Sequence, residues 1–99
     1  MSLNHILVPR TEADVARVIR WYAIRSPQSA RKFVFEFDAI VSTIETNPLA
    51  FPPFDSRLRF AKIKRFPYLI LFRLTPQFVW VVGVGHSSRS GQFWNSRTK

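Results

Sequence analysis

Beyond a short apolar run at its start, the hydrophobic period of this sequence changes once, from a helical part to a strand part. From Val15 to Ile44, apolar residues recur every three or four positions, which is the spacing of one helix face. From Leu58 onward, β-branched and aromatic residues form short runs separated by turn residues, as they do in strands. Residues 48–56 are rich in proline, which interrupts both kinds of structure. We therefore predict one α+β domain over residues 1–99.

Signals for helix ends divide the helical part in two. Thr11 has an acidic residue three positions later, which is typical of a capped helix start, and this helix is expected to run to about Arg25. Ser26 and Pro27 form a second start signal, a capping hydroxyl followed by proline at the first helical position. Pro48 is expected to end the second helix. Because almost no linker separates the two helices, they are expected to form a hairpin.

One short apolar run precedes the helices and three follow them. Residues 3–8 predict the first strand, and the later runs predict strands over residues 58–65, 68–74 and 78–85. The predicted order is β-α-α-β-β-β, with the helical hairpin packed on one face of a mainly antiparallel sheet. The apolar phase shifts between Phe60 and Ala61, which indicates a bulge or an edge strand there.

The positive charge is concentrated in the second half of the chain. Fifteen Lys and Arg stand against six Asp and Glu, a formal net charge of +9. Residues 1–50 hold six basic and five acidic side chains, whereas residues 51–99 hold nine basic ones and a single acid, Asp55. Such an excess repels itself, so an acidic partner is expected. Nucleic acid, a complex that carries nucleic acid and an acidic protein all satisfy this requirement.

The late strands are expected to present basic residues on the sheet face that the helices leave open. Lys62 and Lys64 share a face by the period of two, and Arg73 on the next strand is expected to stand near them. His86 and Arg89 follow the last strand, where loops present reactive side chains. The prediction is a basic, concave open face.

The composition excludes several classes of protein. The chain has no cysteine, so disulfides and thiolate metal sites are excluded. No apolar run approaches the roughly 18 residues that span a bilayer, and residues 1–10 lack the features of a secretion signal. We expect a cytoplasmic protein without a membrane partner. Histidines at metal-ligand spacing and a phosphate-binding glycine loop are also missing, so neither a metal nor a cofactor is expected.

Several motifs along the chain fall in an order that is similar to a known family. Residues 65–73 contain Phe-Pro-Tyr, residues 82–89 end in His-Ser-Ser-Arg, and residues 94–97 are Trp-Asn-Ser-Arg. Shorter matches are Ala-Asp-Val at residues 13–15 and Asn-Pro at residues 47–48. Together they resemble the RelE/ParE toxins of type II toxin–antitoxin (plasmid stabilisation) systems over nearly the whole chain. The resemblance implies this fold, a growth-inhibiting toxin and an acidic cognate antitoxin.

The family that the chain resembles has two activities. RelE-like members cut messenger RNA on the ribosome, and ParE-like members poison DNA gyrase. Lys62 and Lys64 look like the paired lysines of the RNA-cutting branch, and Arg89 stands at the position of its late arginine. However, Leu69 replaces another arginine of that branch, and the Phe-Trp pair at residues 93–94 stands where it has a tyrosine used in cleavage. The Phe-Pro-Tyr and His-Ser-Ser-Arg motifs are more typical of ParE-like sequences.

The resemblance therefore favours a gyrase-poisoning toxin, with a metal-independent endoribonuclease as the alternative and a non-toxic nucleic-acid-binding module as a further one. In the RNA-cutting case, His86 would serve as acid or base and the cations would stabilise the phosphorane. The catalytic candidates are then Arg89, His86, Lys62 and Lys64. The residues expected to bind the target or nucleic acid are Arg59, Lys62, Lys64, Arg73, His86, Arg89, Trp94 and Arg97.

Each of these residues also has a structural interpretation. The basic side chains can form a solvated face, and His86 can make a structural hydrogen bond at the strand end. Trp94 either stacks on a base or packs the tail onto the sheet. The expected partners are the antitoxin and DNA gyrase, or alternatively the ribosome and messenger RNA. A homo-oligomer and a toxin–antitoxin hetero-oligomer both remain open.

Overall fold

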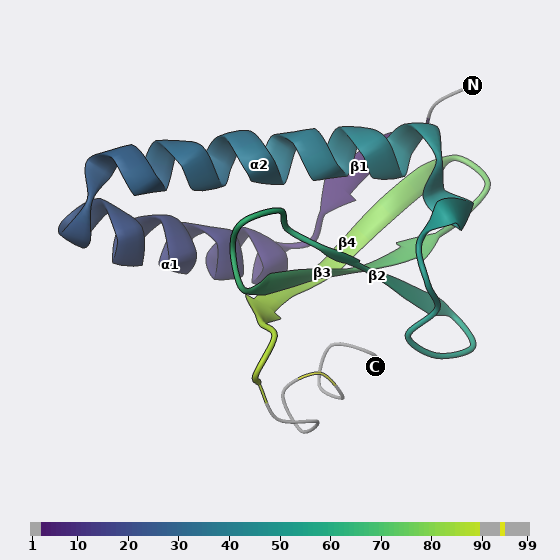
Figure 1. Cartoon of the computed structure of the whole chain (residues 1–99). Coiled ribbons are helices and arrows are strands. Elements are labelled where there is room, and N and C mark those ends of the chain that lie inside the picture. Colours follow the sequence, from purple (N-terminus) through teal and green to yellow (C-terminus); the bar gives the residue numbers. More distant parts are fainter. Residues whose placement is uncertain (1–2, 90–93, 95–99) are drawn as a thin grey trace.

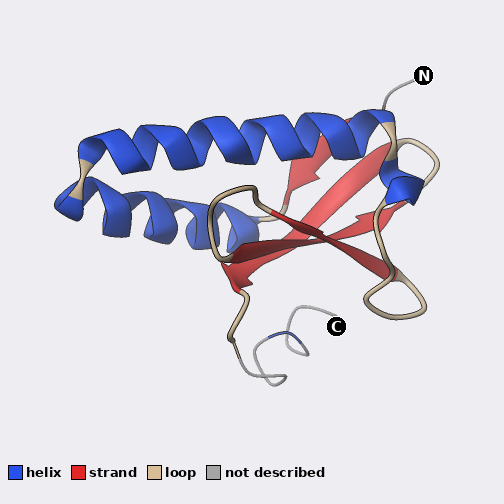
Figure 2. Ribbon diagram, in the orientation of Figure 1, coloured by secondary structure: helices blue, strands red, loops and turns tan. Residues whose placement is uncertain are grey.

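The predicted order of elements, β-α-α-β-β-β, is confirmed in the computed structural model, which describes residues 3–89 and Trp94 (Figure 1). The hairpin of two helices lies over one face of the sheet, so the molecule has two layers (Figure 2). The elements are β1 (Asn4–Leu7), α1 (Pro9–Arg25), α2 (Pro27–Thr46), the short 3-10 helix η1 (Pro48–Ala50), β2 (Leu58–Lys62), β3 (Tyr68–Leu74) and β4 (Phe78–His86).

The four strands form one mixed sheet in the order β1-β4-β3-β2. β1 runs parallel to β4, and the other two pairs are antiparallel. A parallel pair needs a long crossover connection, and α1 and α2 are part of the chain that joins β1 to the rest of the sheet. β2 is an edge strand, which confirms one of the two explanations for its shifted phase. The irregularity lies elsewhere, between Leu71 and Phe72 of β3 where it pairs with β4.

The strand β2 is shorter than predicted, because the chain turns after Lys62. The backbone N–H of Ile63 donates to the carbonyl of Tyr68, and the N–H of Phe66 donates back to Ile63. The intervening Arg65 has a φ of 69°, in the left-handed region. The predicted strand end at residue 65 is therefore wrong, and Lys64 and Arg65 lie in the turn to β3.

The start of α1 also differs from its prediction. The helix begins at Pro9 with Val8 as its cap, two residues before Thr11. Thr11 and Asp14 are instead buried against the sheet. The hydroxyl of Thr11 donates to the carbonyl of Val81 at 2.7 Å, and a carboxylate oxygen of Asp14 accepts from the N–H of Val84 at 3.1 Å. The predicted cap at Thr11 is therefore wrong. The side chains of Thr11 and Asp14 form hydrogen bonds with β4, and the helix begins earlier, at Pro9.

The boundary between the two helices is as predicted. Ser26 caps α2, since its hydroxyl oxygen accepts from the backbone N–H of Ser29 at 3.2 Å, and Pro27 occupies the first turn. The helix ends at Thr46, directly before Asn47 and Pro48. In the part of the chain that the structure describes, neither helix is long and apolar enough to cross a membrane.

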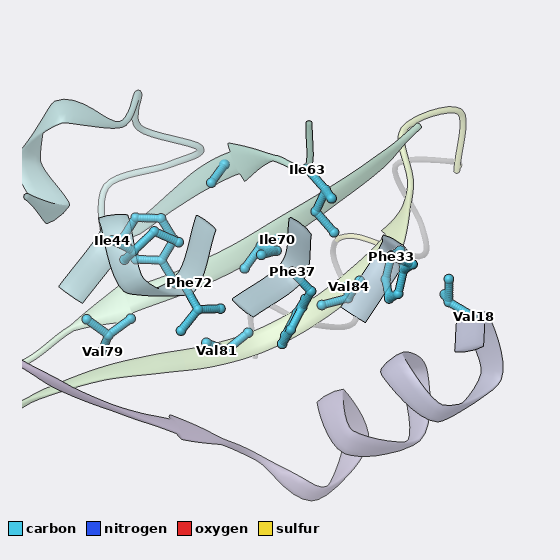
Figure 3. Close-up of a cluster of buried hydrophobic side chains, with 12 residues drawn as sticks. Val18, Phe33, Phe37, Ile44, Ile63, Ile70, Phe72, Val79, Val81 and Val84 are labelled. Carbon is cyan, nitrogen blue, oxygen red and sulfur yellow. The ribbon is translucent and has the colours of Figure 1, made fainter. Parts of the chain in front are cut away.

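The main core lies between the hairpin and the sheet (Figure 3). Phe33 is fully buried, and its ring contacts the rings of Tyr22, Phe66 and Tyr68 at centroid distances of 6.1, 5.4 and 5.8 Å. Burial of such a side chain contributes roughly 1.5–3 kcal/mol. These contacts fix α2 over the ends of β2 and β3. The other core residues are Val18, Phe37, Val41, Ile44, Ala61, Ile63, Ile70, Phe72, Val79, Val81 and Val84.

Candidate functional site

The sheet face opposite the helices is apolar at its centre. Leu58, Leu71 and Trp94 are buried there and pack together. Trp94 therefore packs on the sheet, which was the structural interpretation of this residue. The expectation of a basic open face is wrong at this place, because large apolar side chains occupy the strand positions between the charged ones. Three more of them are partly buried around the cluster: Phe60, Leu69 and Val82.

Lys62 and Arg73 lie at opposite ends of the β2–β3 pair. The register pairs Lys62 with Leu69 and Arg73 with Leu58. Four residues of extended strand span roughly 13 Å, so the expected proximity of these two cations is wrong. Lys64 is exposed in the turn beyond β2. The predicted basic cluster is therefore dispersed over the sheet.

Two other residues, Arg59 and Arg97, were also predicted to bind the target or nucleic acid. Arg59 donates from its guanidinium to the carbonyl of Phe51 at 2.6 Å, which joins the edge strand to the loop before it. This bond gives Arg59 a structural role. Arg97 lies outside the described residues, as does Phe93.

His86 and Arg89 line a groove of about 230 Å³ between α1 and the end of β4. From α1, the groove receives Asp14, Arg17 and Trp21. These three residues share one helix face by their spacing of three and four positions. The groove therefore combines cationic, acidic and aromatic side chains on the helix side of the sheet, whereas Lys62 lies on the opposite side. The remaining lining residues are Val18, Tyr68, Val84 and Gly85.

The ring of His86 is oriented by the turn that follows it. Its Nδ1 accepts from the backbone N–H of Ser88 at 3.1 Å and lies 2.7 Å from the hydroxyl of that residue. Because a backbone N–H only donates, this arrangement assigns Nδ1 as an acceptor and places the proton of the neutral ring on Nε2. The turn is closed by the N–H of Arg89, which donates to the carbonyl of His86 at 2.9 Å. The local sequence thus determines both the orientation of the His86 ring and the position of the Arg89 backbone.

Asp14 connects the groove to the fold. One carboxylate oxygen accepts from the N–H of Val84, and the other lies 3.3 Å from the guanidinium of Arg17. The carboxylate is almost fully buried, whereas Arg17 is 58% exposed. Arg17 therefore leaves part of its charge facing the solvent at the mouth of the groove. Sequence reasoning missed Arg17 and Trp21 as lining residues, and the helical spacing of Asp14, Arg17 and Trp21 was the available signal.

A tyrosine pair connects the groove to the main core, since Tyr68 lines the groove and Tyr22 packs against the core. Burial raises the pKa of Tyr22 above its usual value, and the nearby Tyr68, with which it shares a hydrogen bond, raises it further. The ring of Tyr68 contacts His86 edge-on at a centroid distance of 5.4 Å. These aromatic contacts hold the strand end against the hairpin.

The groove is suited to bind an acidic partner. Arg17, His86 and Arg89 line it together with one carboxylate, that of Asp14, which already accepts hydrogen bonds from Val84 and Arg17. Trp21 is 48% exposed, and the guanidinium of Arg25 lies over its ring at 3.8 Å. Among the described residues, no group of three His, Cys, Asp or Glu is placed to hold a metal ion. The exposed cations and the aromatic ring can recognise an acidic partner by charge and shape.

Comparisons with known proteins decide the family. The model of the family described as "ParE toxin of type II toxin-antitoxin system, parDE" matches residues 6–91. The chain belongs to the ParE toxin family. A solved structure described as "Chromosomal ParDE TA system from P. aeruginosa" matches with a TM-score of 0.74 and 16% sequence identity. The match covers 86% of this chain and 96% of that one, and it supports the same fold. No curated protein gave a significant match.

Motifs that carried the resemblance to the ParE family meet in the groove beside His86. Asp14 belongs to the Ala-Asp-Val motif and Tyr68 to the Phe-Pro-Tyr motif, while His86 and Arg89 begin and end the His-Ser-Ser-Arg motif. The Asp14 motif is more than 50 positions from the other two in the sequence, and all three line one groove of this ParE chain. The predicted ParE-like resemblance is confirmed, and these motifs are joined in space.

Proposed function

We propose that this ParE-family toxin inhibits growth by poisoning DNA gyrase, and that a cognate acidic antitoxin neutralises it. The observation that carries the proposal is the division of the RNA-cutting candidates between two faces of the sheet. His86 and Arg89 line the groove on the helix side. Lys62 pairs with Leu69, whose side chain packs in the cluster on the other side. RNA cleavage needs its acid, base and cations around one phosphate, and this division argues against it.

The packing of Trp94 on the sheet face opposite the helices supports the same proposal. Trp94 is only 6% exposed and packs on Leu58 and Leu71. An RNA strand lying on that face would meet buried apolar side chains in place of a continuous basic surface. The groove with Arg17, His86 and Arg89 is then the place where a gyrase surface binds.

An acidic antitoxin matches the surface of the chain in charge and in apolarity. The net charge is +9, and the first helix of the hairpin exposes Trp21 and Ile24 at 48% and 77%. The neighbouring solved structure comes from a ParDE toxin–antitoxin system. An amphipathic acidic segment that covers these side chains would bury roughly 1,000 Å² or more, as stable complexes do.

Expression of the toxin alone tests the proposal. Cells are induced, and DNA breaks and transcript cuts are measured in parallel, together with the supercoiling activity of purified gyrase. We expect double-strand breaks, inhibited supercoiling and intact transcripts, all reversed when the acidic protein encoded beside the toxin is produced with it. Position-specific cuts in ribosome-bound messenger RNA, without DNA damage, would replace the proposal by the endoribonuclease alternative.

A further inference from the structure

A second and larger groove, of about 630 Å³, runs along α2 beside the turn that joins β2 to β3. In Figure 1, this turn rises from the sheet next to the helices. Arg31, Lys32 and Phe35 line the groove from the helix, and Arg65 lines it from the turn. None of these residues lines the groove beside His86. The second groove is therefore a separate feature of the surface.

The charge in this groove is predominantly positive. Glu36 is the one acidic side chain that lines it, and its carboxylate lies 3.7 Å from the guanidinium of Arg65. Among the described residues, neither Arg31 nor Lys32 forms an ion pair. Arg65 is 74% exposed, so most of its charge also faces solvent. Three cations therefore surround one acid that is largely buried.

At two positions of the groove, the residue present is less favourable for stability than another residue would be. Arg65 has a φ of 69°, a conformation that costs free energy for a residue with a Cβ and that glycine adopts freely. Phe35 leaves 71% of an apolar ring in water. A sequence shaped by stability alone would place glycine at the first position and a polar residue at the second. Such local conflicts with folding rules are typical of binding sites.

The turn is fixed before any ligand arrives. Phe66 follows Arg65 and packs edge-on against Phe33 and Tyr22, at centroid distances of 5.4 and 5.3 Å. Because Phe33 is fully buried, this contact joins the turn to the main core. The backbone of Arg65 is thereby held at the groove, so that little backbone freedom remains to be lost on binding.

We infer that this groove binds single-stranded nucleic acid. Arg31, Lys32 and Arg65 contact backbone phosphates, and an unpaired base stacks on the exposed ring of Phe35. Glu36 accepts a hydrogen bond from an N–H group on the Watson–Crick edge of an unpaired base, such as the N3–H of thymine. Nucleic acid is favoured over an acidic protein because an unpaired base supplies both a flat face for the ring and an N–H donor for the carboxylate. This binding goes beyond gyrase poisoning and does not depend on it.

Anisotropy titrations of the purified chain with labelled oligonucleotides test the inference. The probes are a thymine oligomer of roughly 15 nucleotides, within the range of known single-strand sites, and an abasic oligomer of the same length and charge. We expect the thymine oligomer to bind at least about fivefold more tightly, since stacking is lost without the base. Phe35→Ala is expected to abolish this difference while affinity for the abasic oligomer stays the same.

Arg65→Gly separates binding from folding. The variant should bind the thymine oligomer about fivefold more weakly. The negative slope of log K against log salt should become smaller in magnitude by about 0.7, which corresponds to the loss of one phosphate contact on a single strand. Its unfolding temperature should stay equal or rise, because glycine relieves the left-handed backbone. Arg65→Asn tests the same side chain with a residue that also tolerates this conformation. Arg20→Ala, which removes an exposed charge outside both grooves, is the matched control.

Three results would overturn the inference. The first is equal binding of the thymine and abasic oligomers by the unchanged chain. The second is a loss of affinity in Arg65→Gly and Arg65→Asn no larger than that in Arg20→Ala. The third is a glutamate-rich peptide that binds with dependence on Phe35 and Arg65 while the thymine oligomer does not, which would assign the groove to an acidic protein.

Discussion

Asp14 on the first helix accepts a hydrogen bond from the backbone N–H of Val84 on the last strand at 3.1 Å, across 70 positions of sequence. Thr11 makes a similar connection one helical turn earlier, to the carbonyl of Val81 at 2.7 Å. Both side chains are buried. The two bonds hold α1 against β4 where the groove beside His86 is formed, so this pairing determines the shape of the site as well as the stability of the fold.

Asp14→Ala should destabilise the chain strongly. Hydrogen bonds to buried charged groups contribute roughly 1.5–3 kcal/mol, and the change leaves the N–H of Val84 without this acceptor. We expect the free energy of unfolding to fall by about 2 kcal/mol, measured by urea denaturation. Thr11→Val, which removes a neutral bond, should cost about 1 kcal/mol. Glu12→Ala is the control, since Glu12 is exposed on the same helix turn. An effect of Asp14→Ala no larger than that of the control would contradict the role of this bond.

Local sequence signals predicted some boundaries and missed others. The cap at Ser26 was predicted because its partner, Ser29, is three residues away. Thr11 and Asp14 carry a similar local signal, but their partners are 70 positions away and become neighbours only when the sheet has formed. A pattern in the sequence does not distinguish a side chain that caps its own helix from one that bonds a distant strand.

The sheet register explains the errors at the site. Lys62 and Arg73 were expected to be neighbours because they lie on successive strands, yet the antiparallel pairing places Leu69 opposite Lys62. The turn at Arg65 sets that register, and its left-handed φ is not evident from an arginine. Likewise, Trp94 packs on Leu71, but the sequence around Trp94 has no hydrophobic periodicity from which this contact could be predicted. The motifs were visible in the sequence, but their distribution over two sheet faces required the fold.

Trp94→Ala should open the apolar face of the sheet. Removal of a buried Trp side chain costs about 3 kcal/mol or more, and Leu58 and Leu71 would become accessible to solvent. We expect a lower unfolding temperature and increased binding of a hydrophobic dye. Trp94→Phe should retain most of the stability because a ring still fills the site. If Trp94→Ala unfolds like the unchanged chain, the indole does not stabilise the sheet.

Arg89→Ala should abolish toxicity with little change in the unfolding temperature. The side chain is exposed at the groove and lies outside the apolar cores, and surface substitutions usually change stability by less than about 0.5 kcal/mol. Growth after induction and the unfolding temperature are measured together. Arg57→Ala, another exposed arginine, should leave toxicity intact. A large fall in stability in Arg89→Ala would identify the residue as a structural support and not as part of the binding surface.

The double change Lys62→Ala and Lys64→Ala separates gyrase poisoning from RNA cleavage. Cations that stabilise a developing phosphorane contribute several kcal/mol, so an endoribonuclease should lose at least about 10²-fold in cleavage rate. In a gyrase poison, the same lysines are two exposed charges that do not line the groove beside His86, and each contributes about 0–1 kcal/mol to any interaction. We therefore expect induced cells to retain most of the toxicity and the DNA breaks. The control is the double variant Arg20→Ala and Arg57→Ala, which removes the same amount of charge, and the lysine variant should lose no more potency than this control. Loss of toxicity in the lysine variant alone, together with the loss of cuts in ribosome-bound messenger RNA, would show that the lysines act on RNA, and the gyrase proposal would then be wrong.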